Sequence, residues 1–151
     1  KKGHKCQRQY DEEHRAPAKM LQQEPGEQRP KRRDGAADGR LMIQRCDDCH
    51  KHVFYPRVAC PHCFSERLSW VQASGRGNVY SYTVVYNNAP SAFAPDVPYV
   101  VAVIQLAEGV RMLSNIVQCD LAGLRCDLPV EVTFERLNEE FTLPKFRPVQ
   151  G

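Results

Sequence analysis

The stretch "CDDCHKHVFYPRVACPHC", residues 46–63, contains four of the seven cysteines in a chain of 151 residues. The cysteines form two C-x2-C pairs, Cys46 with Cys49 and Cys60 with Cys63, separated by ten residues. A C-x2-C turn places two sulfurs on one side, and a hairpin that joins two such turns brings four thiolates towards the corners of a tetrahedron. Zn²⁺ prefers this arrangement in closed structural sites. We therefore predict that these four cysteines bind a structural zinc ion.

Other uses of the cysteines fit the sequence less well. "CDDCH", residues 46–50, matches the pattern for covalent haem attachment, but a haem there would leave the second pair unexplained. Disulfides suit neither the odd number of cysteines nor a chain without a recognisable export signal. Iron in a rubredoxin-like site would use the same four sulfurs, so iron stays open. A closed four-sulfur site cannot activate water, which indicates a structural rather than a catalytic metal.

Charge is distributed unevenly along the chain. Residues 1–45 contain 12 Lys and Arg against 7 Asp and Glu, whereas residues 46–151 contain 9 against 11. The body is therefore slightly acidic, which argues against binding of a nucleic-acid backbone as the main function. No apolar run approaches the roughly 18 residues that span a bilayer, and the first residues lack the apolar segment of a signal peptide. We expect a cytoplasmic protein.

The chain after residue 70 has the pattern of a β domain. Short apolar or alternating segments predict strands over 77–87, 98–106, 110–118, 128–137 and 141–149. In the first of them Tyr80, Tyr82 and Tyr86 share one face, which favours the core or the barrel wall. Five strands with little helix between them predict a small barrel of the OB type. The expected organisation is an N-terminal arm, helical or flexible, over 1–39, a four-cysteine ribbon over 40–69 and the OB domain over 70–151.

Several motifs then agree in order with one known family. "LMIQRC" precedes the first cysteine pair, "VFYPR" lies between the pairs, and "GRGNVYSYTVV" (75–85), "PYVVAVIQLAEGVRMLSNIVQCD" (98–120), "LPVEVTFE" (128–135) and "LPKFRP" (143–148) follow. The chain resembles the acyl-CoA-associated zinc-ribbon plus OB-fold family, long described as a domain of unknown function. The likeness runs from Arg40 to Val149. It departs over the N-terminal forty residues and at His50 and Phe64, where a cysteine knuckle often has glycine.

The resemblance implies a non-catalytic accessory subunit. Family members assemble with thiolase-superfamily enzymes, including acyltransferases and steroid side-chain aldolases, and some pair with acyl-CoA hydratases. One relative is the small subunit of the thiolase of the benzylsuccinate pathway. The likeness implies a hetero-oligomer in which the ribbon and the N-terminal helices dock the catalytic subunit and the OB domain helps to hold a coenzyme A thioester. The sequence agrees, because no histidine follows residue 62 and no nucleophile–base pairing is evident.

Two segments are candidates for contact with acyl-CoA or with the partner. The loop "NNAPSAFAPDVP", residues 87–98, is long for a barrel connection, and the C-terminal "LPKFRP" places two cations around a phenylalanine. The expected contact residues are Phe93, Tyr99, Lys145, Phe146 and Arg147. A packed surface loop and a solvated edge strand are the alternatives for the two segments. A nucleic-acid-binding module and a stand-alone acyl-CoA enzyme stay as alternatives for the chain.

Overall fold

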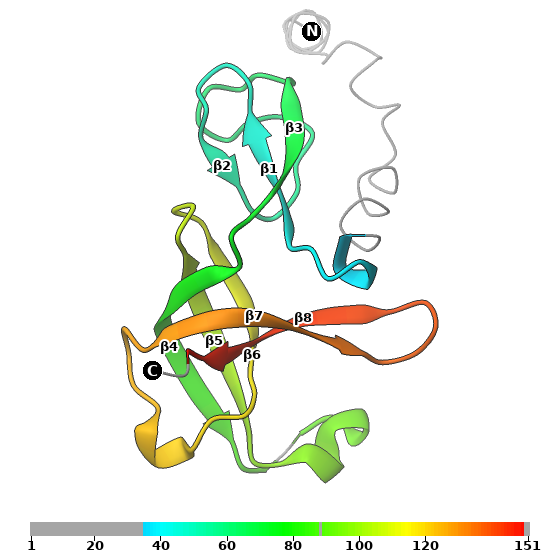
Figure 1. Cartoon of the computed structure of the whole chain (residues 1–151), viewed down its shortest axis with the longest axis vertical. Helices are drawn as coiled ribbons and strands as arrows, with labels where there is room; N and C mark the ends of the chain where they lie inside the picture. The colour runs from blue at the N-terminus through cyan, green and yellow to red at the C-terminus, as the bar shows by residue number, and fades with distance from the viewer. Residues whose placement is uncertain (1–34, 88, 150–151) are drawn as a thin grey trace, which may run out of the picture.

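The computed structural model describes residues 35–87 and 89–149, so residues 1–34 of the arm expected over 1–39 lie outside the described residues. A small three-stranded sheet stands above a closed five-stranded barrel, and β3 leads from one to the other (Figure 1). Within the described part of the chain, no helix is long and apolar enough to cross a membrane. This architecture confirms the mainly β fold that the sequence predicts, a ribbon followed by a barrel.

The small sheet is built around β1 (Met42–Cys46), which pairs antiparallel with β2 (His52–Val53) and β3 (Leu68–Gln72). The second strand has only two residues, shorter than the "KHVFYPR" run suggests. The buried Gln44 side chain accepts a hydrogen bond from the Arg57 amide (2.7 Å) and donates one to the Arg57 carbonyl (3.1 Å). A side chain thus replaces strand pairing at this point. The third strand stays paired with β1 as far as Gln72, past the expected end of the ribbon at residue 69.

The barrel consists of β4 (Arg76–Val85), β5 (Tyr99–Leu106), β6 (Arg111–Ile116), β7 (Pro129–Arg136) and β8 (Thr142–Pro148), closed in the order β4-β5-β6-β8-β7. Four of the five pairings are antiparallel. The fifth is parallel and joins β6 to β8 at Ile116 and Phe146. Two short 3-10 helices, η2 (Ser91–Asp96) and η3 (Leu121–Gly123), lie in the connections. All five predicted strands are therefore confirmed.

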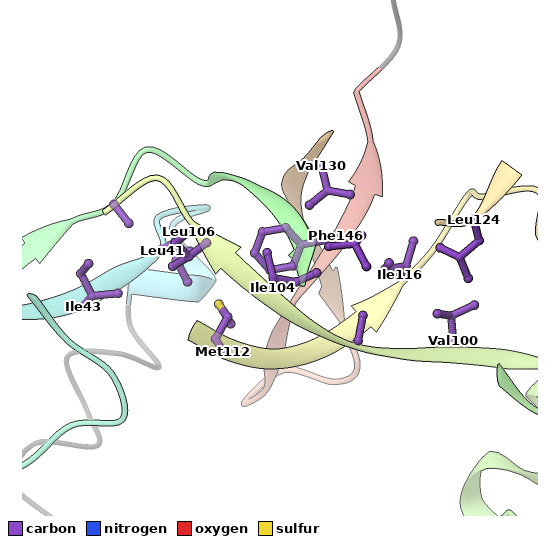
Figure 2. Packing of buried hydrophobic residues seen from close by; sticks show 13 residues of the cluster. Leu41, Ile43, Val100, Ile104, Leu106, Met112, Ile116, Leu124, Val130 and Phe146 are labelled. Atoms are coloured by element: carbon purple, nitrogen blue, oxygen red, sulfur yellow. The ribbon is translucent and has the colours of Figure 1, made fainter. Parts of the chain in front are cut away.

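Strict alternation in β5 supplies the centre of the core. Val100, Ala102, Ile104 and Leu106 are buried, while the residues between them are partly exposed. Phe146 enters the same cluster from β8 and lies beside Ile104 in Figure 2. The buried members of the cluster are Leu41, Ile43, Ala73, Val79, Val100, Ala102, Ile104, Leu106, Met112, Ile116, Leu124, Val130 and Phe146. Burial of this apolar surface is the main force that holds the barrel together.

The tyrosines of the segment 77–87 lie on the barrel wall and not in the core, which is one of the two places that their spacing favours. Val79 is completely buried, whereas Tyr80, Tyr82 and Tyr86 keep 50%, 40% and 65% of their surface exposed. The pairing of β4 with β5 shifts between Val79 and Ser81, which leaves Tyr80 as the extra residue of a β-bulge. A bulge changes which residues face inward, so simple alternation fails across it.

The ribbon and the barrel share part of one core. Leu41 and Ile43 belong to the ribbon segment but pack in the barrel cluster. At the junction, the Ser74 amide donates to Glu108 Oε1 (2.5 Å), and His52 Nδ1 lies 3.1 Å from the Glu108 carbonyl oxygen. Gly75 has a φ of +75°, and a β-carbon there would collide with the Val132 side chain. These contacts set the position of the ribbon relative to the barrel.

Candidate metal centre

The two cysteine pairs form knuckles with the same backbone pattern. In the first knuckle, the His50 amide donates to the Cys46 carbonyl and the Cys46 amide donates to the Lys51 carbonyl, both at 2.9 Å. In the second, the Phe64 amide donates to the Cys60 carbonyl at 2.9 Å, and the Cys60 amide donates to the Ser65 carbonyl at 2.8 Å. The knuckles are thus equivalent turns that present paired sulfurs, as the spacing predicts.

Each knuckle ends on a residue in the left-handed backbone region. His50 has a φ of 59° and Phe64 a φ of 60°. The left-handed conformation costs an L-residue about 1–2 kcal/mol, because its β-carbon approaches the following carbonyl oxygen, and glycine avoids this cost. The structure therefore explains why glycine is usual at these two positions. It also shows that both side chains are tolerated at some energetic cost.

The four sulfurs meet in one cluster. All four Sγ atoms lie within 4.8 Å of one another, with Cys46 Sγ 3.5 Å from Cys63 Sγ and Cys49 Sγ 3.6 Å from Cys60 Sγ. Zinc–sulfur bonds of about 2.3 Å in a tetrahedron require sulfurs about 3.8 Å apart, so the quartet fits a tetrahedral metal ion. In the described part of the chain this is the one group of three or more potential ligands close enough for a metal.

The electrostatics of the sulfurs also favour a bound cation. A hydrogen bond from the Cys49 backbone, with help from the neighbouring thiols, lowers the pKa of Cys46 to about 7. Burial opposes ionisation of Cys60, but hydrogen bonds from the His62 and Cys63 amides and from the thiols lower its pKa. The Ser65 amide favours the Cys63 thiolate, yet burial and the other sulfurs raise its pKa to about 12. A cation removes this repulsion among thiolates and allows all four to ionise.

The structure brings two of the predicted contact residues together. Phe93 lies in η2, with 48% of its surface exposed, and its ring centroid is 6.0 Å from that of Tyr99 at the start of β5. The long loop therefore folds back onto the first residue of the strand that follows it. The pair forms an exposed aromatic corner at one end of the barrel.

The C-terminal candidates separate into two kinds. Phe146 is completely buried in the barrel core, so its ring is a packing residue and is not accessible to a ligand or partner. Strand alternation explains this correction, because Lys145 and Arg147 then point to the other face of β8. Both cations already have carboxylate partners on β7: Lys145 Nζ lies 2.6 Å from Glu135 Oε2, and Arg147 Nη2 lies 2.9 Å from Glu131 Oε1.

Sequence reasoning overlooked the polar groups that hold the ribbon in place. Gln44, which closes the loop onto Arg57, and Glu108, which meets the ribbon at the junction, carry no recognisable motif. Phe64 did carry a signal, because a bulky residue stands there in place of a knuckle glycine. Its exposure of 81% appears only in the structure.

Two family models match the chain in succession. The first is described as the ChsH2 rubredoxin-like zinc ribbon domain and covers residues 33–69, and the second as the ChsH2 C-terminal OB-fold domain and covers residues 70–135. The fold and the metal centre define a zinc-ribbon/OB-fold protein. A DUF35 domain-containing scaffold protein of Methanocaldococcus jannaschii is 37% identical over 101 residues, 66% of this chain and 71% of that protein. The chain belongs to the DUF35 family, as its motifs indicate.

Other relatives have names from CoA-thioester metabolism. A probable enoyl-CoA hydratase alpha subunit of Thermomonospora curvata is 39% identical over 115 residues, which is 76% of this chain but only 35% of that subunit. Benzoylsuccinyl-CoA thiolase subunit BbsA of Geobacter metallireducens is 32% identical over 93 residues, 62% of this chain and 60% of that protein. The chain thus spans about a third of the hydratase subunit that it matches.

Solved structures agree with this assignment. The Ltp2-ChsH2(DUF35) aldolase contains a chain that is 39% identical, with a TM-score of 0.70 over 76% of this chain and 89% of that one. A DUF35-family protein of unknown function from Sulfolobus solfataricus has a TM-score of 0.53 at 16% identity, a likeness of fold alone.

Proposed function

We propose that this protein is a non-catalytic accessory subunit of an enzyme complex that acts on CoA thioesters. It docks a catalytic subunit of the thiolase, acyltransferase or aldolase type in a hetero-oligomer and helps to hold the acyl-CoA. The nucleophile and the general base come from that partner. Thiolates that bind a metal must stay reduced, and the cytoplasm keeps thiols reduced. We therefore assign this protein to the cytoplasm.

The observation that supports this role most directly is the set of names among its relatives. They include scaffold proteins, a thiolase subunit, hydratase alpha subunits and a chain within an aldolase assembly. The chemistry of the site agrees. Four thiolates fill the coordination sphere of a metal and leave no position for water or substrate, so the metal can stabilise the ribbon but cannot activate a substrate.

Zinc is the metal that we assign to this centre. The sulfur spacing suits a tetrahedral ion, and the matched ribbon model is described as a zinc ribbon. Iron in a rubredoxin-type site needs the same geometry, and metal analysis of the purified chain separates the two. A red protein with iron in equimolar amount would overturn the assignment.

The aromatic corner of Phe93 and Tyr99 is the surface that we assign to the acyl chain or to the mouth of the partner's cleft. The two rings are close together, and Phe93 is half exposed at the tip of a long loop. Lys145 and Arg147 are weaker candidates for contact with the CoA phosphates. To bind CoA, each cation would have to leave its carboxylate partner on β7 and pair with a phosphate instead. The larger negative charge of the phosphate would favour this exchange.

A second candidate is an accessory role beside an acyl-CoA hydratase. The likeness to the Thermomonospora curvata hydratase subunit favours it, and so does 36% identity over 102 residues to the 3-oxo-4,17-pregnadiene-20-carboxyl-CoA hydratase alpha subunit of Mycobacterium tuberculosis. Those subunits are about three times longer than the matched region, so this chain would supply only their ribbon and barrel part. A nucleic-acid-binding role has weaker support, because residues 46–151 carry more acidic than basic side chains.

The test is co-purification of the chain, tagged in its own cells, with mass spectrometry of every stoichiometric partner. A thiolase-fold subunit in equal amount, with acyl-CoA turnover that falls when this chain is removed, is the expected result. A hydratase partner would favour the second candidate. Recovery of the chain alone, or with nucleic acid in a salt-sensitive complex, would overturn the accessory role.

A further inference from the structure

Phe64 is the most unusual residue on the surface of the ribbon. It follows the last cysteine of the metal centre and keeps 81% of its surface exposed, more than any other exposed large hydrophobic residue in the described part of the chain. Its φ of 60° places it in the backbone region that suits glycine. A phenylalanine here is unfavourable in two ways, since the backbone is strained and the apolar ring is in water.

No contact that the structure describes for residues 35–87 and 89–149 accounts for this choice. Glycine would adopt the same backbone conformation more easily, and a ring with four-fifths of its surface in water adds little burial. The matching position of the first knuckle has the same φ but carries the polar His50. Bulky residues persist in strained backbone conformations mainly at functional sites, so the ring is best explained by a contact outside this chain.

The knuckle holds the Phe64 backbone in place. The Phe64 amide donates to the Cys60 carbonyl, and the next residue accepts a hydrogen bond from the Cys60 amide. Cys60 and Cys63, on either side of this turn, are both members of the sulfur quartet. Because these bonds fix the backbone that carries the ring, little backbone entropy is lost when the ring binds a partner, and such preorganisation favours affinity.

The surrounding segment indicates what kind of surface the ring meets. Residues 50–63, before the ring, contain no Asp or Glu and expose Lys51 and Arg57, whereas an exposed Glu66 follows the ring. The same segment exposes Tyr55 (51%) and Val58 (45%). The ribbon therefore offers apolar side chains with charges of both signs near them in sequence. An apolar pocket is complementary to the ring, and the mixed charge adds no preference for one sign at its rim.

We propose that Phe64 is the anchor of the ribbon, and that it inserts into an apolar pocket on the catalytic subunit of the complex. This inference rests on the proposed accessory role, and it names the residue through which the ribbon docks. The metal acts on assembly indirectly, because it shapes the turn that presents the ring.

The two knuckles supply a matched pair of variants. Phe64→Gly removes the ring and relieves the backbone strain, while His50→Gly relieves the same strain and leaves the ring. The measurement is titration calorimetry of the metal-loaded full chain against the catalytic subunit identified by co-purification. We expect Phe64→Gly to weaken binding about 30-fold or more, as for an interface hot spot. His50→Gly should stay within about twofold, and Phe64→Trp, which keeps a large ring, should retain most of the affinity.

Metal content and thermal stability of each variant show whether the fold is intact. Phe64→Gly should keep its metal and melt no lower than the wild type, so a loss of binding would then report on the ring. If the wild type binds the subunit and Phe64→Gly binds equally well, the anchor is disproved while the accessory role stands. If the wild type binds no catalytic subunit, both fail.

A photo-crosslinking benzoylphenylalanine in place of Phe64 identifies the occupant directly. Crosslinks to an apolar pocket of the catalytic subunit would support the anchor. Crosslinks to a second copy of this chain, or to residues 1–34 of the same chain, would overturn it. The same probe in place of His50 is the control, and it should react more weakly with the subunit.

Discussion

The ribbon and the barrel are stabilised in different ways. The ribbon's own buried cluster contains only Cys46, Val53 and Cys60, and two of these three residues belong to the sulfur quartet. The barrel cluster contains thirteen buried residues, to which the ribbon segment contributes Leu41 and Ile43. A segment of about 30 residues cannot bury enough apolar surface to fold alone, and a metal commonly makes up the difference.

This difference determines which surface each part can offer to a partner. Barrel strands must direct every second side chain inward, and Phe146 shows how an apparent contact residue is used in the core. The ribbon has the cysteine quartet instead, and a metal bound there would let its apolar side chains remain outside. Phe64 is the clearest example. Its ring is exposed, whereas Cys60, whose carbonyl accepts a hydrogen bond from the Phe64 amide, is completely buried. The predictions below test this contrast.

The largest effect should follow removal of the metal. A strong chelator, or Cys60→Ser, should unfold the ribbon, because structural zinc contributes about 10 kcal/mol or more to the folding of small zinc domains. Hydrogen exchange should then become fast at the Phe64 amide and stay slow at the Ile104 amide. Cys126→Ser, at an exposed cysteine outside the quartet, should keep the metal. Equal loss of protection in β5 would mean that ribbon and barrel unfold as one unit.

The opposite experiment weakens the barrel and spares the ribbon. Phe146→Ala should lower the free energy of unfolding by about 3–5 kcal/mol, because it leaves a cavity at the centre of the core. Denaturant unfolding measures the loss, and metal analysis of the folded protein should still find one ion per chain. Leu113→Ala, at a residue that is 56% exposed on the adjacent β6, is the control and should cost far less. A small loss for Phe146→Ala would contradict its central position.

A smaller effect should distinguish the knuckles from the rest of the ribbon. His50→Gly and Phe64→Gly should each raise the stability of the metal-loaded ribbon by about 0.5–1 kcal/mol, since glycine relieves the left-handed backbone strain. Denaturant titration of both variants at saturating metal measures the change. A stability loss confined to Phe64→Gly would show that the ring packs within its own chain, and this would count against its role as an anchor.

The smallest effects concern the ion pairs on the β7–β8 surface. Double-mutant cycles for Lys145 with Glu135 and for Arg147 with Glu131 should give coupling energies of about 0.2–1 kcal/mol, as for other exposed pairs. The Lys145 pair should be the stronger, because only 18% of that side chain is exposed, against 42% for Arg147. Added salt should reduce both values. A coupling of several kcal/mol would make these cations structural and would argue against their release to bind CoA.

The cysteine spacing and the strand patterns determined most of the architecture in advance. The two C-x2-C pairs predict the knuckles and the sulfur quartet, because the conformation of a short turn is determined mainly by residues that are close together in sequence. The apolar run around Ile104 and the period-two alternation around Val130 predict strands for the same reason. The motifs from Arg40 to Val149 predicted the family. The sulfur quartet, the five strands and the family could therefore be read from the chain itself.

Only the tertiary structure decided which faces these elements present. The bulge at Tyr80 moved Val79 into the core, and closure of β8 against β6 buried Phe146. The junction of Ser74 with Glu108 and the exposure of Phe64 likewise depend on segments far apart in sequence. The physical reason is that local propensity determines the type of an element, whereas its register and its burial follow from long-range pairing and packing.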